Sequence, residues 1–272
     1  MKKIERRFSQ LFALGVVAGG ALALAAPAAH ATPSVGIFYP STETLKPKQG
    51  RVSSDLLSRD MKTTTYGSGG LGYGLGSGSN KAFGQAEIGV DYVAAAPVSN
   101  VNIINRFRFN GKAKLFGDRA GKTTVVGGFW GVGSRGTVGV NSALPPEVVY
   151  LLASRKFKRG SIQAGLARSL AKKIVIQTPG GNSDRTYLQL GFKQSISRRV
   201  DIGIDYYSGK SRISALAPGL EVRLNDHANF KLGYIRYNDQ SIAPSRNQVY
   251  VLIDYVFGGE GDDEGTTPSP LQ

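Results

Sequence analysis

Basic side chains at every second position are the residues of this chain best placed to do chemistry. Arg106, Arg108, Lys112 and Lys114 occupy even positions of the segment 101–115, whose odd positions are mostly apolar. Successive side chains of an extended strand point to opposite faces, so these four bases share one face. A row of bases along a water-filled passage attracts anions and sets charge selectivity. Further bases that we expect on such a face are Arg155, Lys193, Arg223, Lys231 and Arg236.

Catalytic and metal chemistry find little support in the sequence. The chain has two histidines and no cysteine. His30 falls in a predicted leader, and His227 falls in a predicted tight turn, where no nucleophile of a Ser–His pair accompanies it. One histidine without thiolates leaves only scattered carboxylates for a metal. We therefore predict no enzyme activity, no cofactor and no metal site.

Two glycine-rich strings resemble nucleotide-binding motifs without meeting their requirements. The string Gly67-Ser68-Gly69-Gly70-Leu71-Gly72 fits the dinucleotide pattern, but further glycines follow where a helix must begin. In the second string, Gly121-Lys122-Thr123, the preceding glycine is Gly117, one residue too close for a phosphate-binding loop. We interpret both strings as strand or turn.

The first 31 residues have the organisation of a secretory signal peptide. A basic head precedes an apolar run from Leu11 to Ala26, and Ala29-His30-Ala31 supplies the small residues that a signal peptidase requires. We predict cleavage after Ala31 and export. No later apolar run is long enough for a spanning helix, so a membrane location would require a closed β-barrel.

Composition and charge narrow the class of protein further. The 36 glycines and 12 tyrosines suit an all-β chain. The net charge is +15; the leader carries +3 and the tail 258–272 carries −4, which leaves +16 for residues 32–257. Such a charge attracts anions, and nucleic acid is the usual partner of a basic protein. Export argues against nucleic acid, so we predict no such partner.

Period-two alternation of apolar and polar residues predicts a series of strands. Ile88 to Tyr92 and Ile202 to Tyr206 share the string apolar–Gly–apolar–Asp–Tyr, which indicates a recurring strand design. About twelve strands (10–14) are expected, in one antiparallel up-and-down barrel. Their predicted ranges are 50–60, 63–75, 85–92, 101–115, 123–133, 147–157, 161–170, 185–195, 200–206, 213–224, 228–237 and 248–257.

The predicted connections largely alternate between short and long. Tight turns are expected at 118–121, 158–160, 197–199 and 225–227, and longer connections at 134–146, 171–184 and 238–247. Two further connections, 96–100 and 208–212, are shorter than this scheme requires. Short turns on one side and long loops on the other are typical of transmembrane β-barrels.

The last predicted strand resembles the insertion signal of outer-membrane β-barrel proteins. Val251, Ile253, Tyr255 and Phe257 form its apolar face and end in an aromatic residue, although the signal normally ends the chain and 15 residues follow Phe257 here. The resemblance implies recognition by the barrel-assembly machinery and an outer-membrane location in a Gram-negative cell. Tyr92 and Tyr206, with Tyr255 and Phe257, are placed to form aromatic belts at the membrane boundary.

The predicted organisation has four parts. Residues 1–31 form the signal peptide and residues 50–257 the barrel. Residues 32–49 contain Pro33, Pro40 and Pro47, and form either a lead-in or a segment within the lumen. Residues 258–272 form an acidic tail that we expect to be disordered.

The sequence leaves three functions open. The first is a narrow passive channel that favours small anions, with outer-membrane lipid as its other partner. The second is a non-conducting structural or surface-interaction barrel, and the third a soluble exported ligand-binding barrel. Six acidic residues could pair with the bases and fill the interior, but the bases outnumber them, which favours a narrow pore. These acids are Glu87, Asp91, Asp201, Asp205, Glu221 and Asp254.

Overall fold

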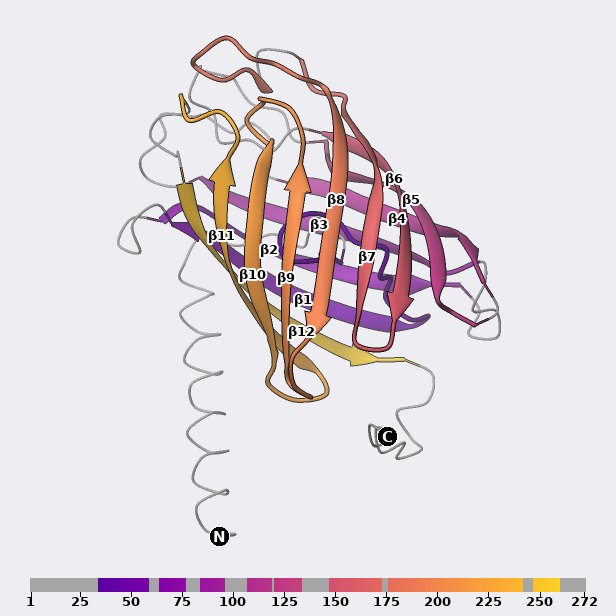
Figure 1. Cartoon of the computed structure of the whole chain (residues 1–272). Coiled ribbons are helices and arrows are strands. Elements are labelled where there is room, and N and C mark those ends of the chain that lie inside the picture. The colour runs from indigo at the N-terminus through magenta and orange to yellow at the C-terminus, as the bar shows by residue number, and fades with distance from the viewer. Residues whose placement is uncertain are drawn as a thin grey trace, which may run out of the picture.

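Antiparallel strands close into one barrel in the computed structural model, which describes residues 34–58, 64–76, 84–95, 107–118, 120–133, 147–172, 176–241 and 247–259 (Figure 1). Within these ranges there are twelve strands, each paired with its neighbours along the chain, and β12 returns to β1. The all-β fold, the meander order and the predicted strand number are therefore confirmed. The strands are β1 (Gln49–Ser58), β2 (Thr64–Leu75), β3 (Ala86–Ala95), β4 (Phe107–Gly117), β5 (Thr123–Val132), β6 (Val148–Phe157), β7 (Gly160–Ser169), β8 (Thr186–Ser195), β9 (Val200–Tyr207), β10 (Ala215–Arg223), β11 (Ala228–Tyr237) and β12 (Asn247–Gly258).

The closing seam between β1 and β12 is a continuous ladder. Its register runs from Gln49 opposite Gly258 to Ser58 opposite Val249. Closure pairs the backbone groups that an open sheet would leave at its edges, and lipid offers no water to satisfy such groups. The barrel wall therefore meets the backbone requirement of a membrane-spanning sheet.

The two faces of each strand differ in the sense that the alternation predicts. On β1, Arg51, Ser53 and Asp55 are buried towards the interior, whereas Val52 and Leu56 are exposed on the outside. The same alternation places Leu188 and Leu190 outside on β8, with Gln189 between them inside. A shift of one residue would exchange the two sets, so the register of every strand is strongly fixed.

Strand boundaries agree closely with the predicted ranges where the structure describes them. The predicted strand 101–115 is observed from Phe107 to Gly117, and its ladder with β5 has irregularities at Phe109/Gly111 and Lys114/Phe116. Residues 101–106, which include the predicted base Arg106, lie outside the described residues, as do the predicted leader and most of the predicted tail. Within the described ranges, no helix is both long and apolar enough to cross a membrane.

The spacing between strands follows the predicted alternation only in part. Four of the connections at one end are short: 118–122, 158–159, 196–199 and 224–227. The connection 76–85 belongs to the same end and is longer. At the other end, the spacings 59–63 and 208–214 are also short, and the longer ones are 133–147, 170–185 and 238–246. The predicted connection 96–100 lies outside the described residues. We call the first end the short-turn end and the other the long-loop end.

Candidate functional site: the barrel lumen

The described residues before β1 lie inside the barrel. Residues 34–48, which we call the N-terminal segment, begin with a tight turn in which Val35 bridges Pro40 and the Gly36 amide donates to the Tyr39 carbonyl at 3.0 Å (Figure 1, indigo). We call residues 35–40 the lumen turn. Ile37 is 1% exposed and Tyr39 0% exposed, so the turn is enclosed by the barrel wall. Of the two roles that the sequence leaves open for this region, its described residues take the place of a lumen segment.

Three glycines of the wall accommodate Ile37. Gly203 on β9, Gly219 on β10 and Gly233 on β11 are direct partners across the ladders. A Cβ atom would stand 3.0, 2.7 and 3.1 Å, respectively, from side-chain atoms of Ile37. We call these three residues the glycine socket. Because contacts below about 3.4 Å are tighter than normal carbon packing, larger residues here would push Ile37 out of place.

Asp205 holds the backbone of the lumen turn. One oxygen of its carboxylate, Oδ2, accepts hydrogen bonds from the amides of Ile37, Phe38 and Tyr39 at 2.8, 2.8 and 3.0 Å. Successive amides that converge on one anion form a backbone nest. A Cβ on Gly36 would stand 2.7 Å from the same carboxylate. The turn therefore requires glycine at position 36 and an acid at position 205.

Two lysines bind carbonyl groups of the same segment. The Lys231 ammonium donates to the carbonyls of Val35 and Gly36 at 2.8 and 2.9 Å. The Lys112 ammonium donates to the carbonyls of Ser34 and Ser41, both at 2.9 Å. Charge-assisted hydrogen bonds of this kind are stronger than neutral ones, so the wall fixes both arms of the turn.

Glu87 on β3 completes the anchoring on the opposite wall. Its carboxylate accepts from the Ser34 amide at 2.6 Å, the Ser34 hydroxyl at 2.8 Å and the Leu45 amide at 2.8 Å. Lys112 and Arg51 each lie 3.8 Å from the same carboxylate. Donors on several sides satisfy this buried acid, as a buried charge requires.

Aromatic stacking fixes the tip of the lumen turn. The rings of Tyr39 and Tyr207 are parallel within 2°, with centroids 3.7 Å apart, and Tyr187 stacks on the far side of Tyr207 at 5.6 Å. The Tyr39 hydroxyl donates to the Ile213 carbonyl. Phe38 packs edge-on against Tyr250, with centroids 5.1 Å apart. The turn therefore carries its own side-chain recognition in addition to the backbone contacts.

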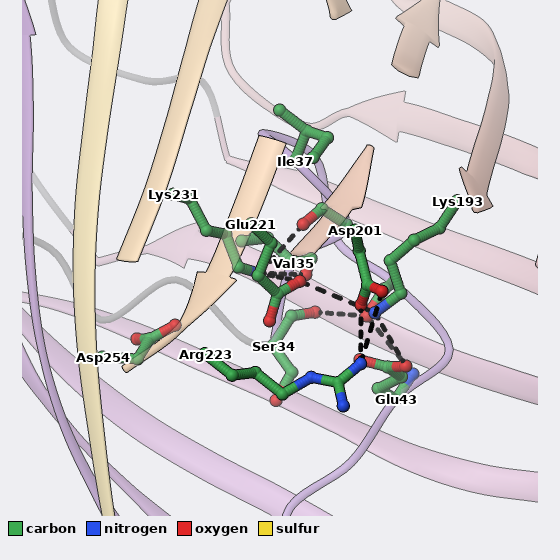
Figure 2. Close-up of polar contacts among 12 residues, drawn as sticks. Ser34, Val35, Ile37, Glu43, Lys193, Asp201, Glu221, Arg223, Lys231 and Asp254 are labelled. Carbon is green, nitrogen blue, oxygen red and sulfur yellow. Dashed lines mark hydrogen bonds and ion pairs between the residues drawn. The ribbon is translucent and has the colours of Figure 1, made fainter. Parts of the chain in front are cut away.

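A chain of ion pairs surrounds the segment (Figure 2). Glu221 lies 3.6 Å from Lys193 and 3.8 Å from Lys231, and Lys193 also reaches Glu43 of the N-terminal segment at 3.2 Å. Arg223 pairs with Asp201 at 3.0 Å. Most of the interior charge at this level is therefore paired within the protein. A cavity of about 20 Å³ remains beside Thr42, Glu43, Lys156 and Lys193, enough for a water molecule.

Six of the predicted lumen bases lie on the inner face of the wall. Arg108 and Lys112 are buried on β4, Lys231 is buried on β11, and the others stand nearer the short-turn end. This last group comprises Lys114, Lys193 and Arg223, which share the inward register of β4, β8 and β10. Lys156, which the sequence analysis did not select, joins them from β6.

Two predicted lumen bases point the other way. Arg155 has the outward register of Leu151, and Arg236 has the outward register of Tyr234. Both stand near strand ends, and the Arg155 guanidinium donates to the Thr123 hydroxyl at 3.2 Å. An outward base near a strand end reaches the polar boundary of a membrane, where its cost is small. The lumen assignment of these two residues is therefore corrected.

The predicted boundary aromatics all lie on the outer face. Tyr92 packs against Phe107 at 5.4 Å on the long-loop half, where Tyr206 also lies. Tyr255 stacks on Phe257 at 6.4 Å at the short-turn end, beyond the exposed Ile253 and the half-buried Val251. His227 lies exposed in the turn next to them, with its Nδ1 3.0 Å from the Val256 carbonyl oxygen.

An ordered loop covers part of the long-loop end. Residues 176–183 between β7 and β8 reach the loop after β11, where the Asp239 carboxylate accepts from Thr178 at 2.9 Å and from Asn182 at 2.7 Å. These hydrogen bonds, with two more from Ser241, hold the pKa of Asp239 below its ordinary value. Ile176 and Thr178 of this loop are themselves buried.

The two faces of the wall decide what kind of barrel this is. Large apolar side chains are exposed on the described outer face, whereas charged side chains such as Glu87, Arg108 and Lys231 are buried inside. A barrel in water has the opposite distribution, and a barrel in lipid requires this one. The chain is a membrane-spanning β-barrel. A soluble ligand-binding barrel, the third function left open by the sequence, does not fit this outer face.

Comparison with known proteins finds similar barrels among solved structures. No protein-family model and no curated protein matches the chain. It is similar to the structure described as "KdgM porin in complex with disordered oligogalacturonate", with a TM-score of 0.47, 9% identity, and coverage of 77% of this chain and 99% of that one. It is also similar to Omp33 of Acinetobacter baumannii, with a TM-score of 0.42, 7% identity, and coverage of 78% and 99%. At these identities the likeness concerns the barrel fold.

The sequence contained one signal for the residues that anchor the N-terminal segment. In both copies of the apolar–Gly–apolar–Asp–Tyr string, glycine and aspartate face the lumen. Gly203 and Asp205 of the second copy receive the lumen turn, whereas Asp91 of the first accepts a hydrogen bond from Asn110. In this string the glycine thus leaves room on the inner face of the wall, and the aspartate supplies a hydrogen-bond acceptor there.

Proposed function

We propose that the barrel is a narrow passive channel that favours small anionic solutes. The observation that carries the proposal is a set of bases at the short-turn end of the lumen, which we call the basic mouth: Lys114, Lys156, Lys193 and Arg223. They come from alternate strands, β4, β6, β8 and β10, and therefore lie around one side of the opening. Fixed charges in a narrow passage raise the local concentration of counter-ions and exclude co-ions.

The interior supports a small conductance. The N-terminal segment and the ion pairs around it occupy much of the lumen, and the cavity beside Lys156 and Lys193 is the volume of a water molecule or little more. Small hydrated ions, not large solutes, suit such a path. The same observation favours the second function that the sequence leaves open, a non-conducting structural or surface-interaction barrel.

Planar-bilayer recording of the refolded full chain separates these two functions. The channel proposal expects an ohmic current of small amplitude whose reversal potential in a KCl gradient indicates chloride preference. A folded barrel that inserts and gives no current would establish the non-conducting function instead. A cation preference would contradict the role given to the basic mouth.

Charge reversal within the basic mouth tests the selectivity. The double substitution Lys114→Glu and Lys156→Glu is expected to lower the chloride-to-potassium permeability ratio by roughly twofold or more, because each charge within a few ångströms of the path is worth about 0.5–1 kcal/mol in water. Reversal potentials in a salt gradient measure this ratio. Arg155→Glu is the matched control, because Arg155 is next to Lys156 in the chain and faces outward. An equal effect of the control would show that the mouth does not set selectivity.

A further inference from the structure

The N-terminal segment is held in the lumen as a ligand is held in a binding site. Its lumen turn contributes amides to Asp205 and carbonyls to Lys231, and the Pro40 carbonyl accepts from Gln189. The wall therefore recognises both donors and acceptors of one short stretch of backbone. Such paired recognition of a turn is specific, because a displaced turn would leave buried charges unsatisfied.

Side-chain sockets add sequence specificity to this backbone recognition. Ile37 fills the glycine socket, and Tyr39 stacks on Tyr207. A second small site on β2 receives the other end of the segment: a Cβ on Gly74 would stand 1.9 Å from the Lys46 carbonyl oxygen and 3.1 Å from Leu45 Cβ. Ile37 and Tyr39, two positions apart, are thus recognised by separate parts of the wall, the glycine socket and the Tyr207 ring.

The barrel is closed without this segment. Within the described residues, the segment forms no ladder with any of the twelve strands, and its turn is closed by the isolated bridge between Val35 and Pro40. The seam from β1 to β12 is continuous from Gln49 onwards. Release of residues 34–45 would therefore expose their binding site and leave the ladders of the wall intact, as well as the hydrogen bond from the Lys48 amide to the Gly74 carbonyl.

From these observations we propose that residues 34–45 are a displaceable internal ligand, and that the lumen wall contains a peptide-binding site for the sequence Ser-Val-Gly-Ile-Phe-Tyr-Pro-Ser-Thr-Glu-Thr-Leu. The site consists of the glycine socket, Asp205, Lys231 and Tyr207 on the β9–β11 side, with Glu87 and Lys112 opposite. A free peptide of this sequence binds when the tethered copy is unseated. Only the electrical readout of this inference rests on the proposed channel function; peptide binding does not.

The test uses the full chain with the triple substitution Ile37→Ser, Phe38→Ser and Tyr39→Ser, which removes the side-chain recognition of the tethered copy. A fluorescently labelled peptide of residues 34–45 is titrated against the refolded variant, and anisotropy is recorded. Saturable binding is expected. The unsubstituted chain is expected to bind at least about tenfold more weakly, because its tethered copy competes at an effective concentration on the order of millimolar.

Two controls make the result specific. A scrambled peptide of the same composition should not bind. Adding Gly233→Val to the triple variant should abolish binding of the native peptide, because a Cβ atom at position 233 would already stand 3.1 Å from the Ile37 side chain and the two methyl groups of valine would fill the socket. Heat-modifiable gel migration verifies that each variant is folded. If the triple variant does not fold, Ile37→Ala alone serves in its place.

The outcomes separate this inference from the channel proposal. Saturable and sequence-dependent binding supports the internal ligand, and block of the triple variant's current by added peptide supports both. Peptide binding without current in any variant contradicts the channel and leaves the internal ligand standing. Equal binding of native and scrambled peptides, or no binding by a folded variant, overturns the internal ligand.

Discussion

Arginine in place of Leu190 is expected to lower the free energy of unfolding by about 2–4 kcal/mol, the cost of a base near the bilayer midplane on the lipid face of a barrel. Leu190 lies at the middle of β8, is exposed and shares the outer face with Leu188 and Phe192. Urea titration of the barrel in lipid vesicles, followed by tryptophan fluorescence, measures the change. Trp130 is the single tryptophan of the chain and is buried in the fold.

A matched substitution on the same strand gives the contrast. Gln194→Arg places the same charge on the same outward register, four residues nearer the short-turn end. Near the membrane boundary the cost falls to about 0–1 kcal/mol, because the side chain reaches water. Equal losses at the two positions would mean that the outer face of β8 does not cross a lipid layer.

Removal of the Asp205 carboxylate is the second change with a large expected effect. Asp205→Ala leaves three amides of the lumen turn without their acceptor. We expect a loss of about 2–4 kcal/mol in the free energy of unfolding, since buried donors left unpaired lose their hydrogen bonds without regaining water. The same urea titration measures it. Faster proteolysis of the N-terminal segment should accompany the loss.

Asp201→Ala on the same strand is the control for Asp205. Asp201 also faces the lumen, but its partner Arg223 is half exposed, and this ion pair does not touch the lumen turn. Such a partly solvated pair contributes about 1 kcal/mol or less. If Asp205→Ala costs no more than Asp201→Ala, the carboxylate at 205 does not anchor the turn.

The alternation of residue types was sufficient to predict the barrel. Strands such as β7, β8 and β11 lie within one residue of their predicted ranges. The reason is physical: with lipid on one side of the wall and charge on the other, a shift of one residue is costly. The alternation of residue types therefore determines the register. The pattern of β4 was less regular, because its register with β5 shifts at Phe109/Gly111 and Lys114/Phe116 and interrupts the period of two.

The polar character of the lumen could be predicted from the sequence, but the contacts of its side chains could not. The inward register of Lys112 and Lys231 follows from their strands, but their partners are carbonyls of Ser34 and Val35, far away in the sequence. Contacts of this type depend on closure of the whole barrel. Arg155 and Arg236 were assigned to the lumen on charge, whereas their register on β6 and β11 places them outside. For bases near strand ends, register is the better guide.

The central claim is that one face of each strand meets lipid and the other lines the interior, and single-cysteine labelling of β8 tests it most directly. The chain has no native cysteine, so a cysteine at each position from Tyr187 to Lys193 can carry one fluorophore, attached before refolding into vesicles that contain brominated lipid. We predict strong quenching at 188, 190 and 192 and weak quenching at 187, 189, 191 and 193. Quenching that is uniform along β8, or strongest at the odd positions, would contradict the membrane-spanning barrel.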